Sequence, residues 1–370
     1  MRFVIFTHSL VSDWNNGNAH FLRGIASELL SRGHELAIFE PESGWSRQNL
    51  LREHGQGAIE NFHKAFPQLR SALYDDRTLD LNQALWGADV VMVHEWNPPE
   101  LVARIGRHRA GRDYQLFFHD THHRSLSDRE GIAAYDLSCF DGVLAYGTAI
   151  RNAYRALGWG LHAWTWHEAA DIRVFRPLPS IEKVGDLVWI GNWGDGERAD
   201  TLREFLIEPV RSLRLRARVY GVRYPQEALR ELAEAGIEYG GWLPNHKVPE
   251  VFARYQLTLH VPRHHYVEAL PGIPTIRPFE AMACGIPLIS APWKDSERMF
   301  SPGEDFLFAR NGKEMISHLK LLLKQPLIRS RLITHALQTI RSRHTCAHRV
   351  DELFSFIGSP VAMSVPEGKT

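Results

Sequence analysis

Two consecutive series of strand-like and helix-like segments constrain this chain more than any other feature. The first opens with RFVIF, a continuous apolar run typical of a strand buried in a parallel sheet, followed by a polar loop and the helical pattern AHFLRGIASELLSRG. The second opens at GDLVWIGNWGDGERADTLREF, again strand, glycine-containing loop and helix. Such alternation predicts parallel sheets with right-handed crossovers. We therefore expect an α/β protein with two Rossmann-like, doubly wound domains.

A proline-containing stretch near residues 171–183 separates the two series. With 370 residues, the chain is also too long for one core of ordinary size. We predict one domain over residues 1–175, a second over 176–340, and a last helix with a flexible tail over 341–370. Ligands bind at the carboxyl ends of parallel strands, so we expect a ligand cleft between the two domains.

The overall composition excludes several classes of protein. The formal net charge is zero, which argues against bulk electrostatic capture of nucleic acid or acidic membranes. The basic runs 104–112 and 211–219 read as solvated faces or, alternatively, as a site for an anionic acceptor or a membrane surface. Three cysteines without a CxxC pair favour a reducing compartment. No apolar stretch approaches the ~20 residues of a membrane span, and the N-terminus reads as a buried strand. We predict a cytoplasmic protein without stable membrane insertion.

The loop THSLVSDWNNGNAH (7–20) is long for a simple turn between strand and helix. Gly17, at the junction with the helix, permits close approach of a ligand to backbone N–H groups. Trp14 could stack on a sugar ring, while Asn15, Asn18 and His20 could hydrogen-bond its hydroxyls. The alternative is an ordinary connecting loop with an asparagine cap.

A cluster of polar residues, FFHDTHH (117–123), ends a strand of the first series. At this strand end His119 would point into the cleft and contact a sugar or polarise a reacting group, with Asp120 holding its tautomer or capping a helix. His122 is a candidate acceptor contact. Metal binding is the rival interpretation, but the spacing matches no pattern with defined coordination, so we predict no metal site. A purely structural role is the third possibility.

Glycine-containing segments of the second series predict a pocket for a pyrophosphate. In GNWGDGER the glycines, Gly191 first, follow a strand, and Arg198 and Arg203 stand on the next helix. No acidic residue stands where a dinucleotide-binding fold requires one, but glycines beside an arginine still suit a pyrophosphate. The plain alternative for Arg198 is a surface helix residue. Arg263, in VPRHHYVEALPG, is a possible sugar contact or loop surface.

The stretch LPGIPTIRPFEAMACG (270–285) leads a stiff loop into a helix N-terminus. Backbone N–H groups of Gly272, Ile273 and Thr275 could meet a phosphate, and Arg277 could add charge. Glu280, in the first turn, is placed to accept two hydrogen bonds from a vicinal diol such as that of ribose. A carboxylate favoured by the helix dipole is the simpler interpretation.

RPFEAMACGIPLIS (277–290), together with DIRVFRPL (171–178), resembles the donor-binding signature of GT-B glycosyltransferases of the group 1 or CgeB-like (spore maturation) type. The resemblance implies that the N-terminal domain binds the acceptor, that the C-terminal domain binds a nucleotide sugar, and that the last helix returns to the first domain. It also implies that neither a cofactor nor a metal is required.

The resemblance assigns roles residue by residue. Glu280 corresponds to the second glutamate of an E-x7-E motif, which binds the donor ribose, whereas Gly272 stands in place of the first glutamate. Arg198 corresponds to a phosphate-binding arginine, and Arg203 would replace a lysine of the family. His119 matches a histidine that contacts the donor sugar, and residues 15–18 match a glycine loop near the β-phosphate.

We therefore predict a hexosyltransferase that uses a nucleoside-diphosphate sugar, preferably a UDP-sugar. Transfer would be metal-independent and retaining, to an unidentified acceptor that is a sugar, natural product, lipid or modified base. If transfer inverts configuration, the candidate bases are Asp13, His119 and Asp120. The alternatives are a UDP-sugar epimerase on the same fold and a non-catalytic nucleotide-binding or coat-assembly protein.

Overall fold

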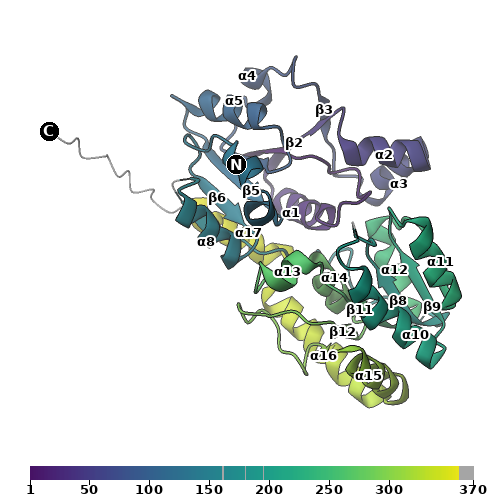
Figure 1. Cartoon of the computed structure of the whole chain (residues 1–370). Coiled ribbons are helices and arrows are strands. Elements are labelled where there is room, and N and C mark those ends of the chain that lie inside the picture. Colours follow the sequence, from purple (N-terminus) through teal and green to yellow (C-terminus); the bar gives the residue numbers. More distant parts are fainter. Residues whose placement is uncertain (161, 180, 195, 358–370) are drawn as a thin grey trace.

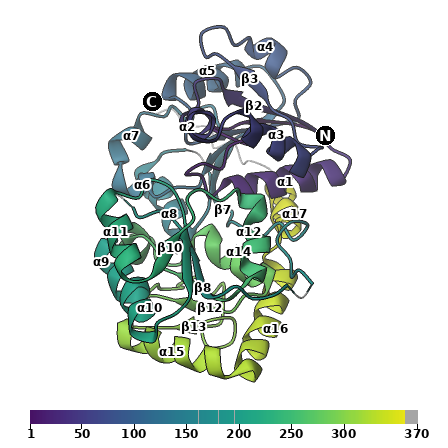
Figure 2. The same cartoon turned by 90° about the vertical axis from the view of Figure 1, so that its right-hand side faces the viewer.

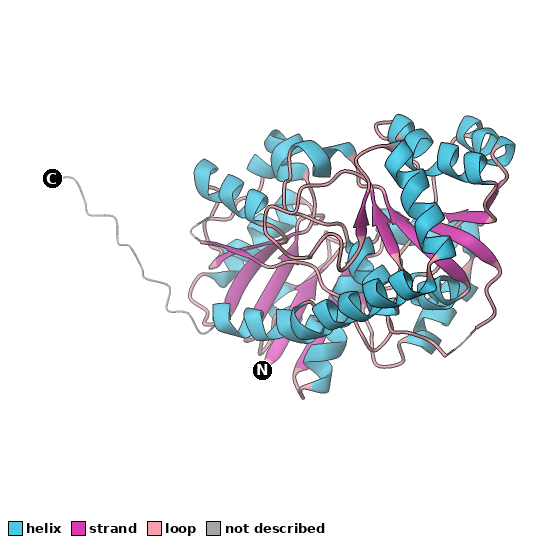
Figure 3. Ribbon diagram, turned by 90° about the horizontal axis from the view of Figure 1, so that it is seen from below, coloured by secondary structure: helices cyan, strands magenta, loops and turns pink. Residues whose placement is uncertain are grey.

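The computed structural model describes residues 1–160, 162–179, 181–194 and 196–357. It contains two β-sheets with helices on both faces of each (Figures 1 and 3). Every strand pairing among these residues is parallel. The predicted α/β class with two doubly wound sheets is therefore confirmed.

The first sheet has seven strands in the order β3-β2-β1-β4-β5-β6-β7. Its strands are β1 (Arg2–Phe6), β2 (Glu35–Pro41), β3 (Ala72–Tyr74), β4 (Val90–His94), β5 (Gln115–Asp120), β6 (Gly142–Ala145) and β7 (Ala163–Thr165). Its helices are α1 (Ala19–Ser31), α2 (Trp45–His54), α3 (Gln56–Ala65), α4 (Leu81–Ala84), α5 (Pro99–Arg109), α6 (Arg124–Ser127), α7 (Arg129–Ala133) and α8 (Thr148–Leu157). The central strands are apolar and buried on both faces, as the sequence predicted.

The second sheet has six strands in the order β10-β9-β8-β11-β12-β13. Its strands are β8 (Gly185–Ile190), β9 (Ala217–Tyr220), β10 (Ile237–Tyr239), β11 (Tyr255–His260), β12 (Leu288–Ser290) and β13 (Leu307–Phe308). The helices that accompany it are α9 (Ala199–Leu202), the π-helix η1 (Arg203–Ile207), α10 (Glu208–Leu213), α11 (Gln226–Glu234), the 3-10 helix η2 (Asn245–Lys247), α12 (Val248–Ala253), α13 (His264–Glu268), α14 (Ile276–Cys284), α15 (Gly312–Lys324) and α16 (Pro326–Arg343).

The last described helix, α17 (Cys346–Ile357), lies against α1 of the first domain (Figures 1 and 2). The side chain of Cys346 fills the space beside Gly24, where an added Cβ would lie 2.4 Å from its sulfur. Arg32 forms an ion pair with Asp351 at 2.6 Å. These contacts join the end of the described chain to its beginning. The domain boundaries proposed above stay predictions, and the predicted tail over 358–370 lies outside the described residues.

Two further properties bear on the environment of the chain. Among the helices of the described residues, none combines the length and apolarity that a membrane span requires. The cysteines Cys139, Cys284 and Cys346 are all free thiols, so none joins another in a disulfide.

Candidate active site

Two adjoining pockets lie between the domains, beyond the carboxyl end of β8. We call them the Glu168 pocket and the Trp242 pocket, because each of these residues lines only one of the two. Their volumes are about 200 Å³ and about 160 Å³, respectively. They share Gly17 of the first domain, and Ile190, Gly191, Asn192 and Arg277 of the second. The predicted site residues that line one pocket or both are Asn15, Gly17, Asn18, Gly191, Arg198, Arg263, Thr275 and Arg277.

Arg198 is a buried cation that faces the Glu168 pocket. Its guanidinium donates to the carbonyl oxygens of Asn192 and of Val261, the latter at 3.1 Å, and lies over the ring of Trp189. Nε has no hydrogen-bond partner, and no carboxylate of the described residues forms an ion pair with Arg198. Burial, together with the charge of Arg263, lowers the pKa of Arg198 to about 10. A buried guanidinium without an anionic partner is costly unless a ligand supplies the anion.

Arg277 lines both pockets from the first turn of α14. Its Nη1 donates to Glu280 Oε2, and Glu280 is fully buried. The other oxygen of Glu280 accepts hydrogen bonds from Asn245 Nδ2 at 2.8 Å and from His20 Nδ1 at 2.9 Å. Burial raises the pKa of Glu280, but Arg277 and the two hydrogen bonds more than offset this, so that the pKa lies below its ordinary value. The carboxylate is thus charged, and both of its oxygens accept hydrogen bonds from protein groups.

The tautomer of His20 follows from its contacts. The backbone N–H of Asp171 donates to His20 Nε2 at 2.7 Å, so Nε2 carries no proton. Nδ1 therefore carries the proton and donates it to Glu280, with His20 neutral. His20 is buried on α1, stacks on Phe175 and lines neither pocket. It joins the two domains rather than reaching an acceptor.

The backbone donors expected from the glycine segments are already occupied. Gly191 N–H donates to the Tyr220 carbonyl at 2.9 Å, Gly272 N–H to Lys294 at 2.7 Å, and Ile273 N–H to Leu270 at 3.2 Å. It is Gly221 that permits the close approach of these two backbones, since a Cβ at position 221 would lie 2.1 Å from the carbonyl oxygen of Gly191. Gly272 and Ile273 line neither pocket, so they are not part of the candidate site.

The backbone conformation and the packing at position 272 explain why glycine stands there in place of an acidic residue. It adopts a left-handed φ of +93°, and an added Cβ would lie 2.6 Å from Glu297 Cγ. The space of a side chain at position 272 is therefore filled by Glu297. That glutamate in turn accepts a hydrogen bond from His167 Nε2 at 2.8 Å, across the two domains.

The strand-end residues His119 and Asp120 are buried outside the two pockets. His119 is buried against Trp166, and its Nε2 has no hydrogen-bond partner. Asp120 is fully buried and accepts hydrogen bonds from the backbone of His122 and from the hydroxyl of Tyr154, at 3.0 and 2.9 Å. Burial and the charge of Glu95 raise the pKa of Asp120 to about 8. Asp120 thus orders the loop after β5, and neither side chain lines either pocket.

The remaining predicted residues also lie elsewhere. Trp14 is buried, and its indole N–H donates to Glu53 at 2.7 Å, so its ring cannot stack on a ligand in the cleft. His122 packs against Trp96 and His123 outside both pockets. Arg203, on η1, is paired with Glu231 at 2.6 Å and half exposed. None of these three side chains is therefore part of the candidate site.

Several residues that line the pockets were not predicted from the sequence. Glu168 and Tyr146 come from the first domain; Asn192, Trp242, His260 and Tyr266 come from the second. Glu168 follows β7, a three-residue strand that the sequence pattern did not predict. Its position three residues after the end of β7 could have marked Glu168 as a site residue, but only if β7 had been predicted from the sequence.

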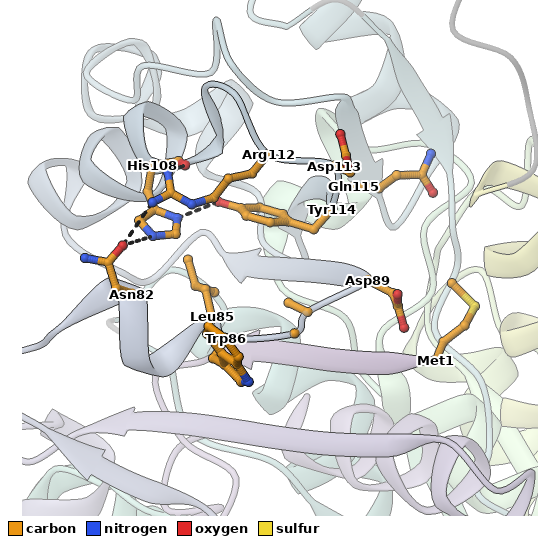
Figure 4. A pocket seen from close by; sticks show the side chains of 12 residues that line it. Met1, Asn82, Leu85, Trp86, Asp89, His108, Arg112, Asp113, Tyr114 and Gln115 are labelled. Carbon is orange, nitrogen blue, oxygen red and sulfur yellow. Dashed lines mark hydrogen bonds between the residues drawn. The ribbon is translucent and has the colours of Figure 1, made fainter.

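Two other observations concern metal ligands and a pocket outside the candidate site. Among the described residues, no three His, Cys, Asp or Glu side chains gather as a metal site. A separate pocket of about 630 Å³ lies at the opposite end of the strands of the first sheet, beside Met1, Trp86 and Tyr114 (Figure 4). Its residues flank the amino ends of β1, β4 and β5, whereas ligands of parallel sheets bind at the carboxyl ends.

Comparison with known proteins identifies the class to which this fold belongs. Residues 198–355 match the family model described as glycosyl transferase-like. Sucrose-phosphate synthase from Thermosynechococcus elongatus is 12% identical, with a TM-score of 0.65 over 96% of this chain and 98% of that chain. The HepE protein of Anabaena, solved with UDP and glucose, is 13% identical, with a TM-score of 0.68 over 97% and 100% of the respective chains.

The β-glucosyltransferase of phage T4, a DNA-modifying enzyme solved with UDP-glucose, gives a TM-score of 0.61 at 14% identity over 97% and 100% of the two chains. No curated protein sequence matches this chain. The fold is that of the GT-B glycosyltransferases, as predicted. The family match and the fold together support the predicted enzyme class, a glycosyltransferase. The CgeB-like subtype is not confirmed.

Proposed function

We propose that this chain transfers a hexose from a UDP-sugar to an acceptor hydroxyl in the cleft between its domains. The observation that carries the proposal is Arg198, a buried guanidinium that lines the pocket; among the described residues its Nε has no hydrogen-bond partner and no carboxylate forms an ion pair with it. A diphosphate supplies the missing anion. That structural neighbours were solved with UDP or UDP-glucose supports the same choice of donor.

The two pockets suit the two ends of such a donor. Trp242, Leu243, Val222 and Val248 give the Trp242 pocket apolar walls that fit a uracil ring. The shared wall carries Arg277 beside a glycine backbone and suits the diphosphate. The sugar then falls in the Glu168 pocket, which Arg198 also lines. Asn18 and Tyr146 face this pocket from the first domain, the side from which an acceptor would enter.

In the proposed step, the bond between the anomeric carbon and the phosphate oxygen breaks, and a bond from that carbon to the acceptor oxygen forms. Arg198 and Arg277 stabilise the charge that develops on the departing UDP, an effect on the order of 3–4 kcal/mol per well-placed donor. These two cations support metal-independent transfer.

The carboxyl groups of the two pockets support retention of configuration. Asp13 already accepts hydrogen bonds from Arg23, from the indole of Trp242 and from the backbone of Asn245. Burial and the neighbouring charges of Glu280 and Glu95 raise the pKa of Glu168 well above its ordinary value, so it holds its proton. Because neither acid is a free base, the departing phosphate oxygen takes the acceptor proton.

The ribose contact predicted for Glu280 needs an exchange of hydrogen-bond partners. Glu280 lines neither pocket, and all its present donors are protein groups. His20 belongs to the other domain, so domain opening would release it and let a ribose hydroxyl take its place. We propose this exchange as the route by which Glu280 meets the donor.

A thermal-shift screen of UDP-, GDP- and TDP-sugars tests the choice of donor, followed by transfer assays with acceptor mixtures, each with and without EDTA. A donor at about 100 times its dissociation constant adds about 2.7 kcal/mol of stability. We expect UDP-sugars to stabilise the chain most, EDTA to have no effect, and the product to keep the anomeric configuration. Stabilisation by no nucleotide sugar would contradict the proposal.

A further inference from the structure

Glu168 is a buried acid with no role in the donor contacts described so far. It lies in the segment after β7, is 2% exposed, and lines the pocket assigned to the sugar. Its Oε1 has no hydrogen-bond partner among the described residues. An unsatisfied buried carboxyl oxygen at a pocket wall is a position where a ligand group would relieve a real cost.

The backbone that carries Glu168 is firmly held. Trp166 Nε1 donates to the carbonyl of Arg349 on α17 at 2.8 Å, and Arg349 Nε donates to the carbonyl of Glu168 at 3.4 Å. Ala170 N–H donates to the carbonyl of His344 at 2.9 Å. Hydrogen bonds thus fix the backbone before and after Glu168, so its side chain lines the pocket from a rigid segment.

The surroundings of Glu168 decide its charge. Five ionisable groups interact electrostatically with Glu168. They are Glu280 and Arg277 of α14, Glu95 after β4, and the phenols of Tyr146 and Tyr266. Two of these are carboxyl groups, and the one guanidinium is already bound to Glu280. A carboxylate at this place would be desolvated without a donor, so Glu168 is a neutral acid with an O–H to donate.

We propose that the carboxylic acid of Glu168 donates a hydrogen bond to one hydroxyl of the transferred sugar and so selects sugars that carry a hydroxyl at that position. This inference rests on the proposed function, because it assigns the sugar to the Glu168 pocket. Rejection of a sugar that lacks this hydroxyl follows because the buried acid is then left unpaired.

Calorimetry of the full chain with UDP and UDP-glucose tests the inference with three proteins. Wild type, Glu168→Gln and Glu168→Ala should bind UDP alike. Glu168→Ala should bind UDP-glucose about five- to tenfold more weakly than wild type, the scale of one lost hydrogen bond. Glu168→Gln keeps an N–H donor and should lose much less. Glu227→Ala, an exposed glutamate on α11, is the matched control.

The monodeoxy analogues of UDP-glucose give a second measurement that needs only wild type and Glu168→Ala. One analogue should bind wild type more weakly than UDP-glucose by the same factor, and that difference should vanish in Glu168→Ala. Equal affinity of wild type for every analogue would overturn the inference. So would a loss in Glu168→Gln as large as in Glu168→Ala, which would mean a charged carboxylate. If wild type binds neither UDP nor UDP-glucose, the proposed function fails first, and this inference with it.

Discussion

At the scale of single residues, the candidate site depends on Arg198, a buried cation that forms no ion pair with a carboxylate of the described residues. Arg198 and Arg277 could be predicted from sequence because each stands beside a glycine-containing turn at the start of a helix. Glu168 could not, because the strand that positions it has three residues. The sequence also placed His119 and Asp120 near the cleft, but strand-end side chains point to either face, and these two are buried.

Replacement of Arg198 separates binding from stability. Arg198→Met removes a buried charge that has no ion-pair partner among the described residues and keeps an apolar stem, so the melting temperature without ligand should stay equal or rise. The affinity for UDP-glucose should fall by about 1.5–3 kcal/mol, the scale of charged hydrogen bonds. Calorimetry and thermal unfolding measure both quantities. Arg203→Met, on the outer face of η1, is the control and should bind like wild type. Equal losses in the two variants would remove Arg198 from the site.

At the scale of secondary-structure elements, the loop between α13 and α14 holds the domains together. Ile273 extends from this loop into the core of the first domain, where its side chain packs on the backbone of Gly147. Thr148 N–H donates to Glu297 at 2.8 Å in the same contact. The long buried strands were predictable from continuous apolar runs, whereas the edge strands β3 and β7 were not, because three residues show no periodicity. This contact between loops has no local sequence pattern at all.

A methyl group at position 147 tests this contact. A Cβ there would lie 2.2 Å from Ile273 Cγ1, so Gly147→Ala should force the domains apart and lower the free energy of unfolding by about 1–3 kcal/mol. UDP-glucose should also bind more weakly, because the pockets lie between the domains. Gly57→Ala, on α3 with no atom within 4 Å of the new methyl, should instead be neutral or stabilising by up to about 1 kcal/mol. Thermal unfolding with and without UDP-glucose compares the two, and identical behaviour would refute the role of the contact.

At the scale of the whole molecule, buried neutral histidines set the response to acid. Burial lowers the pKa of His8, His260 and His344 to about 3, and that of His123 to about 4. Below pH 6.5 the unfolded chain binds protons at these positions and the folded chain does not. The free energy of unfolding should therefore fall as the pH drops from about 6.5 towards 4, by about 1.4 kcal/mol per pH unit for each histidine.

The raised pKa of Asp120, about 8, acts in the opposite direction over the same range, and so does the raised pKa of Glu168, so both reduce the effect of the histidines. Denaturant unfolding at pH 7 and pH 5 measures the net effect. His344→Gln should reduce the difference between the two pH values. Equal stability of wild type at both pH values would contradict the account.

A crystal structure of the full chain with bound UDP tests the central claim most directly. We expect uracil beside Trp242 and Val222, and the diphosphate against Gly191 within reach of Arg277 and Arg198. UDP bound outside the two pockets, or with its diphosphate turned away from both arginines, would contradict this claim.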